Sequence, residues 1–327
     1  MGRRRLRLVA VVAAVAAAVL AIDAARASAT YPGTNGRIAF SNYVTGQIYT
    51  VNPDGSGLVQ LTHTEGTDRA ADFPSWSPNG KRILFTKFRY AGDDHSRIWI
   101  MKADGTDKHQ VTGDARGFRD YTPKFTPDSS RIVFTRCLPD DGVCAIWKMR
   151  ANGNHMHALT PYIDGLNDEA VDFNLSISPN GRWIAFTRFF EGGFAARIVL
   201  MRIDGSDAHP ITPAWIEGGQ PDWSPDGQRI VFHSNAPRAG SSLFTIKPDG
   251  TDRHRLTANR FPHSDALATY SPQGDQVAFI SDRNYPDVCC TDLFAIDSDG
   301  TGEHMIDTGL SDSGILSPSW GTAPLLP

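Results

Sequence analysis

The chain has 327 residues, of which 10% are aromatic and 21% are charged, and its formal net charge is −4. This length supports a large hydrophobic core or several smaller cores in series. The negative net charge excludes a global basic field of the kind that attracts nucleic acid.

The first 29 residues predict a secretory signal peptide. A basic start is followed by the apolar run 8–22, which contains no charge, and Ala27-Ser28-Ala29 supplies the small residues that signal peptidase recognises. Cleavage after Ala29 removes five Arg and one Asp, which takes the formal net charge from −4 to −8. An uncleaved membrane anchor is the alternative, although the run is short for a membrane span. We therefore expect an exported protein, secreted or held in the periplasm or cell envelope, with no stable membrane anchor after cleavage.

Six sequence repeats follow the signal peptide, within residues 30–321. The most regular marker is an I-x-F tripeptide, which reads V-x-F in the sixth repeat and whose phenylalanine recurs every 45–52 residues. These phenylalanines are Phe40, Phe85, Phe134, Phe186, Phe232 and Phe279. An Asn-Gly or Asp-Gly pair recurs in the same phase, and a period of this length is typical of propeller blades.

The second repeat shows the four strands, A to D, that we predict in each. Strand A covers 72–77, strand B 82–87, strand C 97–102 and strand D 108–112. Tight turns join A to B and C to D, because Asx-Gly pairs adopt the positive φ that short hairpins require. Longer, irregular loops join B to C, and D to the next A.

The two ends of the repeat array are complementary. The first repeat begins directly at strand B, with its I-x-F sequence ending at Phe40, and a lone A strand, 315–320, is left near the C-terminus. Pairing of these two strands closes a ring and leaves no open sheet edge between the ends. We therefore predict an all-β fold: a six-bladed β-propeller of four-stranded antiparallel blades over residues 30–321, with a short tail at 322–327.

The fifth repeat carries a family resemblance. Trp223-Ser-Pro-Asp-Gly-Gln-Arg-Ile-Val-Phe232, followed by Lys247-Pro-Asp-Gly-Thr251, resembles the TolB-type, WD-like (PD40) propeller repeat. The resemblance implies the propeller fold and spans proteins of different function: periplasmic TolB, the propellers of prolyl-oligopeptidase-type proteases, and some polysaccharide lyases. The sequence contains neither a G-x-S-x-G nucleophile motif nor the small α/β domain that precedes the TolB propeller.

The topology predicts two unlike faces. The tight A–B and C–D turns share one face, called the tight-turn face below, and the B–C and D–A loops share the other, called the long-loop face. Variable loops on a rigid scaffold usually carry function, so the long-loop face is our candidate binding surface. Its candidate ligand- or partner-binding residues are Asp72, Asp120, Asp172 and Asp265 in the D–A region, and Phe189 and Phe190 in a B–C region. The alternative is that the acidic residues cap turns and solvate loops.

The A strands should line a central channel. Residues that alternate with the recurrent aromatic position form a predicted ring of Ser75, Lys124, Ser176, Asp222, Thr269 and Ser319. Lys124 and Asp222 are its charged members and complete the candidate binding set. A funnel for a small ligand and a plain polar channel both fit this pattern.

The four cysteines fit an exported protein. Cys137 and Cys144 flank a predicted hairpin loop, and we expect a disulfide across its base. Cys289 and Cys290 are adjacent and form a strained vicinal disulfide, remain thiols or pair between molecules. Redox chemistry or metal binding is the alternative role for these cysteines.

No coherent catalytic or metal-binding set emerges from the sequence. Five of the ten histidines occupy the same position of the outermost strand, and equivalent positions of a ring point away from one another. We predict no catalytic residues, no metal and no cofactor, and the sequence indicates no oligomeric state. The leading hypothesis is a secreted, non-catalytic propeller that binds a protein or a cell-envelope component through its long-loop face. The alternative is an enzyme, a metal-assisted polysaccharide lyase or hydrolase with its site at the channel mouth.

Overall fold

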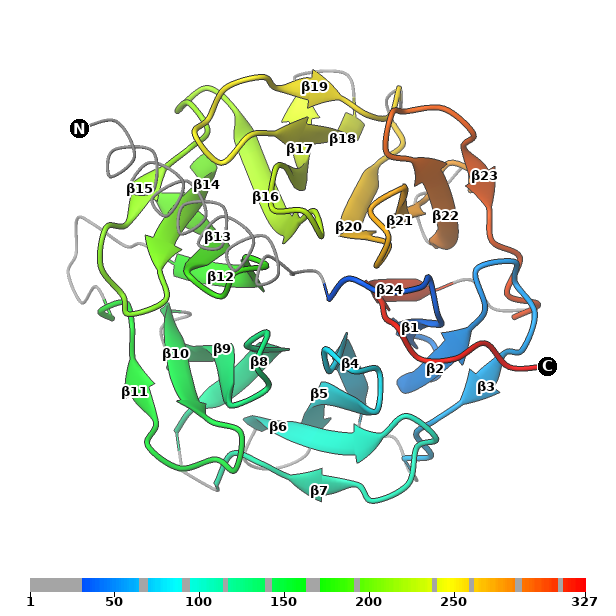
Figure 1. Cartoon of the computed structure of the whole chain (residues 1–327), viewed down its shortest axis with the longest axis horizontal. Coiled ribbons are helices and arrows are strands. Elements are labelled where there is room, and N and C mark those ends of the chain that lie inside the picture. The colour runs from blue at the N-terminus through cyan, green and yellow to red at the C-terminus, as the bar shows by residue number, and fades with distance from the viewer. Residues whose placement is uncertain are drawn as a thin grey trace, which may run out of the picture.

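Six antiparallel four-stranded sheets stand around a central axis in the computed structural model of the chain, which confirms the predicted six-bladed propeller (Figure 1). The structure describes residues 31–64, 70–89, 95–113, 117–138, 143–162, 171–190, 195–236, 240–258, 262–285, 290–310 and 314–327. The predicted signal peptide lies outside these residues. Within them no helix occurs that is long and apolar enough to cross a membrane.

The first three blades follow the chain from the innermost strand outward, except that the innermost strand of blade 1 is the last strand of the chain. Blade 1 contains β24 (Ile315–Trp320), β1 (Ile38–Asn42), β2 (Gln47–Val51) and β3 (Val59–Gln60). Blade 2 contains β4 (Ala71–Trp76), β5 (Arg82–Arg89), β6 (His95–Lys102) and β7 (His109–Gln110). Blade 3 contains β8 (Arg119–Phe125), β9 (Arg131–Cys137), β10 (Cys144–Arg150) and β11 (His157–Ala158).

The other three blades repeat this order. Blade 4 contains β12 (Val171–Ile177), β13 (Trp183–Phe190), β14 (Ala195–Arg202) and β15 (His209–Pro210). Blade 5 contains β16 (Glu217–Trp223), β17 (Ile230–Ala236), β18 (Gly240–Ile246) and β19 (His254–Arg255). Blade 6 contains β20 (Asp265–Tyr270), β21 (Gln276–Ser281), β22 (Asp292–Asp297) and β23 (His304–Met305).

The ring is closed by the predicted pairing of the two chain ends. β24 runs antiparallel to β1, with Ile38 opposite Trp320 and Asn42 opposite Ile315. The Trp320 indole Nε1 also donates a hydrogen bond to the Gly36 carbonyl at 2.8 Å. The C-terminal strand therefore supplies the inner edge that the first repeat lacks.

The hydrophobic core lies between adjacent blades. At the blade 2–3 interface, for example, Leu84 and Ile98 of blade 2 pack with Phe125 and Phe134 of blade 3. Similar clusters fill the other interfaces, and the phenylalanine of every I-x-F sequence is buried. Side chains alternate between the two faces of strands B and C, and each face of a blade packs against a different neighbouring blade, so both sets of side chains are buried.

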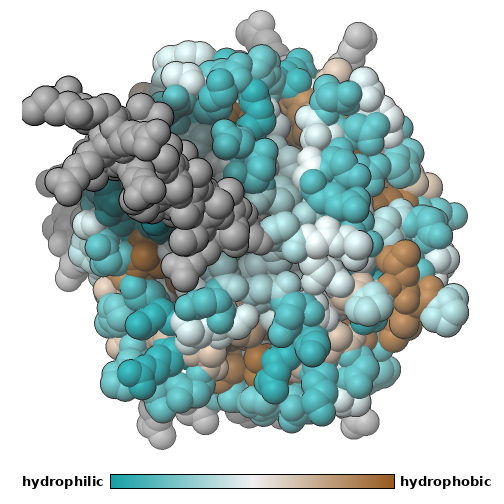
Figure 2. Space-filling model, viewed as in Figure 1, coloured by the Kyte–Doolittle hydropathy of each residue, from teal (hydrophilic) through white to brown (hydrophobic). Residues whose placement is uncertain are grey.

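The chain ends cross the tight-turn face, which is turned toward the viewer in Figure 1. The C-terminal tail binds the turns of blades 1 and 2, with Leu326 N donating to the Asn52 side chain at 3.0 Å. Gly80 in an A–B turn has φ 65°, and a Cβ there would lie 2.5 Å from Ala323 N, so glycine lets the tail approach. This face is predominantly hydrophilic apart from apolar patches near its rim (Figure 2).

Candidate ligand-binding channel

A ring of six left-handed residues lines the central channel. In every blade the register of the innermost strand shifts three residues before the aromatic position, which creates a β-bulge there. The residues at the bulges, with φ of 47–56°, are Phe73, Thr122, Asn174, Gln220, Leu267 and Ser317. A left-handed conformation costs a non-glycine residue about 1–2 kcal/mol. All six residues line the channel cavity.

Side chains satisfy the backbone of these bulges. Gln220 N donates to Thr187 Oγ1 at 2.9 Å, and Leu267 N donates to Gln220 Oε1 at 3.0 Å. These bonds offset part of the strain, because an unpaired buried N–H costs about 1–3 kcal/mol. The inner ring is therefore held rigidly.

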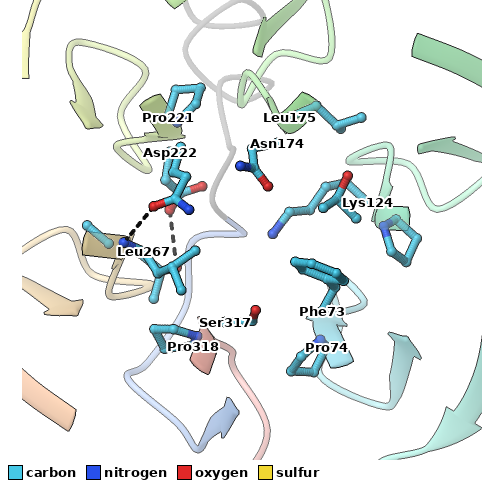
Figure 3. A pocket seen from close by; sticks show the side chains of 15 residues that line it. Phe73, Pro74, Lys124, Asn174, Leu175, Pro221, Asp222, Leu267, Ser317 and Pro318 are labelled. Carbon is cyan, nitrogen blue, oxygen red and sulfur yellow. Dashed lines mark hydrogen bonds between the residues drawn. The ribbon is translucent and has the colours of Figure 1, made fainter. Parts of the chain in front are cut away.

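Lys124 and Asp222 face the channel among these residues (Figure 3). The Asp222 carboxylate accepts hydrogen bonds from Ser176 Oγ at 2.8 Å, Tyr270 N at 3.0 Å and Thr269 Oγ1 at 3.2 Å. Nζ of Lys124, by contrast, forms no hydrogen bond or ion pair with any of the residues that the structure describes, and it points into the channel beside Asn174 (Figure 3). Asp222 is thus a satisfied structural carboxylate, whereas Lys124 presents an available ammonium.

Burial sets the electrostatics of these two groups. It lowers the pKa of the Lys124 ammonium, and the negative charge of Asp222 opposes that change. Burial likewise raises the pKa of the Asp222 carboxyl, against the opposing effects of Lys124 and the three hydrogen-bond donors. A second anion placed at Lys124 would favour its charged form, so anion binding and protonation of Lys124 are coupled.

The channel cavity has a volume of about 70 Å³. This volume is well below the roughly 300–1,000 Å³ of small-molecule pockets. The channel therefore admits a functional group, such as a carboxylate, rather than an enclosed ligand.

A short N-terminal segment, residues 31–35, crosses the tight-turn end of the channel (Figure 1). Tyr31 donates its hydroxyl hydrogen bond to the Phe125 carbonyl of blade 3 at 2.7 Å. Two and four residues later, Gly33 and Asn35 bond to blade 6, with Gly33 N 3.4 Å from Pro272 O and Asn35 Nδ2 2.9 Å from Asp275 Oδ1. Blades 3 and 6 stand opposite each other, so this segment bridges the central channel.

Four aromatic rings gather on the long-loop side of the channel. The cluster consists of Phe73, Phe88, Tyr121 and Phe173, all half-buried. Their ring centroids are 5.6 Å apart for Tyr121 and Phe173, 5.8 Å for Phe88 and Tyr121, and 6.3 Å for Phe73 and Phe173. The cluster belongs to blades 2, 3 and 4. On the opposite side, the positions that match Tyr121 and Phe173 hold Gly219, Ala266 and Leu316.

Three of the predicted binding aspartates lie inside the blade interfaces instead. Asp120 is fully buried and accepts two hydrogen bonds from Arg136, from Nε at 2.7 Å and Nη2 at 3.0 Å. Asp172 accepts the same pair from Arg188, at 2.6 and 2.8 Å. Asp265 accepts one from Arg283 Nη2 at 2.7 Å. None of the three lines the channel cavity, and bidentate pairing leaves Asp120 and Asp172 little capacity for a ligand.

The fourth aspartate, Asp72, lies at the contact between blades 1 and 2. It accepts hydrogen bonds from Ser41 Oγ and from the backbone N–H of Phe73. Burial raises the pKa of the Asp72 carboxyl, and the Ser41 hydrogen bond opposes that change. Its contacts hold the bulge at Phe73 in place, and it does not line the channel cavity.

The two phenylalanines predicted to bind a partner, Phe189 and Phe190, lie on the long-loop face. Phe189 and Phe190 are both half-buried at the end of β13. Phe189 lines a side cavity between blades 4 and 5, and the Phe190 ring lies under the Arg197 guanidinium, 5.4 Å from its carbon. They do not join the aromatic cluster at the channel.

Three of the six residues predicted to line the channel do so. Lys124, Asp222 and Thr269 line the cavity, but Ser75, Ser176 and Ser319 are buried between blades. The three serines share the strand position of Lys124, Asp222 and Thr269, but their side chains are short, and the cavity is lined in addition by the residue three before the aromatic position, at the bulge. A signal for it exists in the sequence, because proline follows that residue in four of the six repeats, at Pro74, Pro123, Pro221 and Pro318.

The disulfide prediction is confirmed at one site. Cys137 and Cys144 pair across the base of the β9–β10 hairpin, where they are register partners. Cys289 lies outside the described residues, so the state of Cys289 and Cys290 stays a prediction. No group of three His, Cys, Asp or Glu side chains that would suit a metal ion occurs in the described ranges.

The family model of the TolB beta propeller domain matches residues 24–214. The chain belongs to this family. Among the curated relatives of this TolB-type propeller is the Tol-Pal system protein TolB of Francisella tularensis, 26% identical over 260 residues, which are 78% of this chain and 55% of the relative. Another is dipeptidyl-peptidase 5 of Porphyromonas gingivalis, 24% identical over 254 residues, which are 74% of this chain and 34% of the relative.

Solved structures agree on the fold. The crystal structure of TolB from Acinetobacter baumannii matches with a TM-score of 0.67 at 18% identity, over 88% of this chain and 66% of that one. The TolB-type propeller spans about a third of the length of the peptidase relative and about half that of the curated TolB. What these proteins share with the chain is the propeller, and their names indicate different functions.

Proposed function

We propose that this TolB-type propeller is an exported, non-catalytic binding protein. Its partner is a protein or cell-envelope component that approaches from the long-loop face and inserts an acidic group toward Lys124. The observation that carries the proposal is the available Lys124 ammonium in a channel too small for an enclosed ligand. A carboxylate on a larger partner meets both conditions, because only its terminal atoms need to enter.

The direction of approach follows from the chain segment at the other end. Residues 31–35 are bonded to blades 3 and 6 across the tight-turn end, so the long-loop end offers the route to Lys124. The half-buried aromatic cluster of Phe73, Phe88, Tyr121 and Phe173 flanks that route and supplies apolar contact area for a partner. Aromatic residues with a nearby cation are typical of protein-binding hot spots.

Two further features support export and a protein partner. The Cys137–Cys144 disulfide is of a kind that persists in oxidising compartments. One relative is a protein of the Tol-Pal system, so the same scaffold serves an assembly of proteins there.

The test is capture of a partner from cell-envelope extract on immobilised protein. We expect a specific partner to be retained by the wild type, lost with Lys124→Met, and weakened when Phe189 and Phe190 are both changed to Ser. The matched control is Lys81→Met, which removes an exposed lysine from an A–B turn on the opposite face. If Lys124→Met has the wild-type Tm and still captures the partner, the proposal is wrong.

A further inference from the structure

A second, larger cavity lies beside the channel, between blades 4 and 5. Its volume is about 350 Å³, which falls within the roughly 300–1,000 Å³ of small-molecule pockets. It shares Asn174 and Gln220 with the channel cavity. Its remaining walls come from β13, β14, β16 and β17, and Phe189, Glu217, His233 and Asn235 are among the side chains that they contribute.

The cavity exists because blade 5 lacks an ion pair that its neighbours have. The carboxylates of Asp120 and Asp172 stand five residues before the aromatic position, and their arginines stand two residues after the I-x-F phenylalanine. At the corresponding positions blade 5 has Gly218 and Ser234. Two small residues therefore replace a carboxylate and a guanidinium in blade 5, and Gly218 is one of the residues that line the cavity.

A second glycine makes room for a histidine. A Cβ on Gly219 would lie 2.6 Å from Cε1 of His233, its register partner on β17, so only glycine accepts the imidazole there. Nδ1 of His233 is buried and has no hydrogen-bond partner within the described ranges. A buried ring nitrogen without a partner costs about 1–3 kcal/mol, which a ligand hydroxyl in the cavity would recover.

The polar groups of the cavity are almost all uncharged. Asn174, Gln220 and Asn235 present amides, and Gln220 Nε2 makes no hydrogen bond to a described residue, because only its Oε1 is used, by Leu267 N. Burial lowers the pKa of His233 to about 4, against the opposing effect of a hydrogen bond to the Gly219 backbone, so the ring is neutral near pH 7 and Nδ1 is its nitrogen without a partner. Glu217 is the one ionisable group besides His233 among the lining residues, and it lies exposed at the rim.

We propose that this cavity binds an uncharged sugar, as a free saccharide or as a residue of a glycan. Vicinal hydroxyls both donate and accept, which matches amides that do the same and a neutral imidazole whose Nδ1 has no partner in the described residues. The half-buried Phe189 ring supplies an apolar wall for the face of the sugar ring. The volume accommodates about one or two pyranose rings.

Other ligand chemistries fit this cavity less well. An anion would find no cationic side chain among the lining residues and would lie near Glu217. An apolar ligand would leave the buried Nδ1 of His233 and the Gln220 amide without partners.

Calorimetric titration of the purified protein tests the proposal directly. The probes are the neutral disaccharides maltose, cellobiose and diacetylchitobiose, with digalacturonate and a blocked neutral tripeptide as comparisons. We expect at least one neutral disaccharide to bind with a Kd below about 10 mM, and neither comparison ligand to match it. The test uses no protein partner, so its outcome is separate from that of the proposed partner binding.

The variants connect binding to the cavity. His233→Leu removes the ring nitrogens and Gly219→Ala pushes the imidazole aside, so each is expected to weaken binding by about tenfold or more. His233→Gln, which keeps a donor and an acceptor, should retain part of the affinity. The control is His263→Leu, because Nδ1 of His263 is also buried without a hydrogen bond, 3.6 Å from Asp282 Oδ1, but lies outside this cavity. The proposal is overturned if no neutral disaccharide binds, if a comparison ligand binds better, or if folded His233→Leu and Gly219→Ala bind like the wild type.

Discussion

The Asp120–Arg136 pair offers a sharp test of how the blades are held together. The Asp120 carboxylate is 0% exposed, and both of its oxygens accept hydrogen bonds from one guanidinium. The Arg136 guanidinium carbon lies 5.1 Å from the ring centroids of Phe118 and Trp147, in a setting with little access to water. Changing Asp120→Asn leaves a buried cation without its counter-charge.

The expected cost of Asp120→Asn is about 3–5 kcal/mol of unfolding free energy, since breaking a buried ion pair from one side strands the other charge. For a domain of this size that lowers Tm by about 5–15 °C. Urea titration and calorimetry measure the two quantities. The control Asp104→Asn, in an exposed C–D turn, should change the unfolding free energy by less than about 0.5 kcal/mol.

A double substitution distinguishes the cost of losing one partner of the ion pair from the cost of losing the whole pair. Asp120→Leu combined with Arg136→Met removes both charges and should restore most of the lost stability, because apolar residues of similar volume replace buried pairs at little cost. An Asp120→Asn protein that keeps the wild-type Tm but fails to capture its partner would refute this reasoning. Asp120 would then be a binding residue, as its sequence position first suggested.

Three further outcomes follow from the structure. Reducing the Cys137–Cys144 disulfide, which closes a loop with a sequence separation of 7, should lower the unfolding free energy by about 2 kcal/mol, and equal urea midpoints with and without reductant would contradict this. The pKa of His233 is lowered to about 4, whereas the imidazole of the unfolded chain binds a proton below about pH 6.5, so acid favours the unfolded state. Between pH 7 and pH 4.5 the free energy of unfolding of the wild type should therefore fall by about 2–3 kcal/mol more than that of His233→Gln. Tyr31→Phe removes the hydrogen bond to the Phe125 carbonyl and should cost about 0.5–1.5 kcal/mol, measured by urea titration, and no change would show that this bond contributes nothing to the segment's position.

The architecture was predictable because its signals repeat. Five I-x-F sequences and one V-x-F sequence in constant phase predict six equivalent strands. The missing first A strand together with Ile315–Trp320 predicts the closure that the β1–β24 register confirms. One repeat alone is weak evidence for a fold, but six repeats at a fixed period are compatible with few architectures.

The channel was less predictable because it depends on breaks in the repeat. Ser75 and Ser176 hold the strand position of Lys124 and Asp222 but their short side chains are buried, and the left-handed residue of each bulge lines the cavity in addition. The Asp120–Arg136 pair had a readable signal, since an arginine follows the I-x-F phenylalanine by two residues in the third and fourth repeats, two of the three that carry the aspartate. Nothing in the sequence marks Tyr31 as a residue that reaches across the ring, because that contact joins residues 94 apart in the chain.

The most direct measurement of the central claim is photocrosslinking from both ends of the channel. A benzoylphenylalanine at position 88 places the reactive group in the aromatic cluster on the long-loop side, and one at position 81 places it on the tight-turn face. If a partner binds over the long-loop mouth and reaches Lys124, the crosslink forms from position 88, disappears with Lys124→Met, and does not form from position 81. A crosslink from position 81 alone, or one from position 88 that persists in folded Lys124→Met, would contradict it.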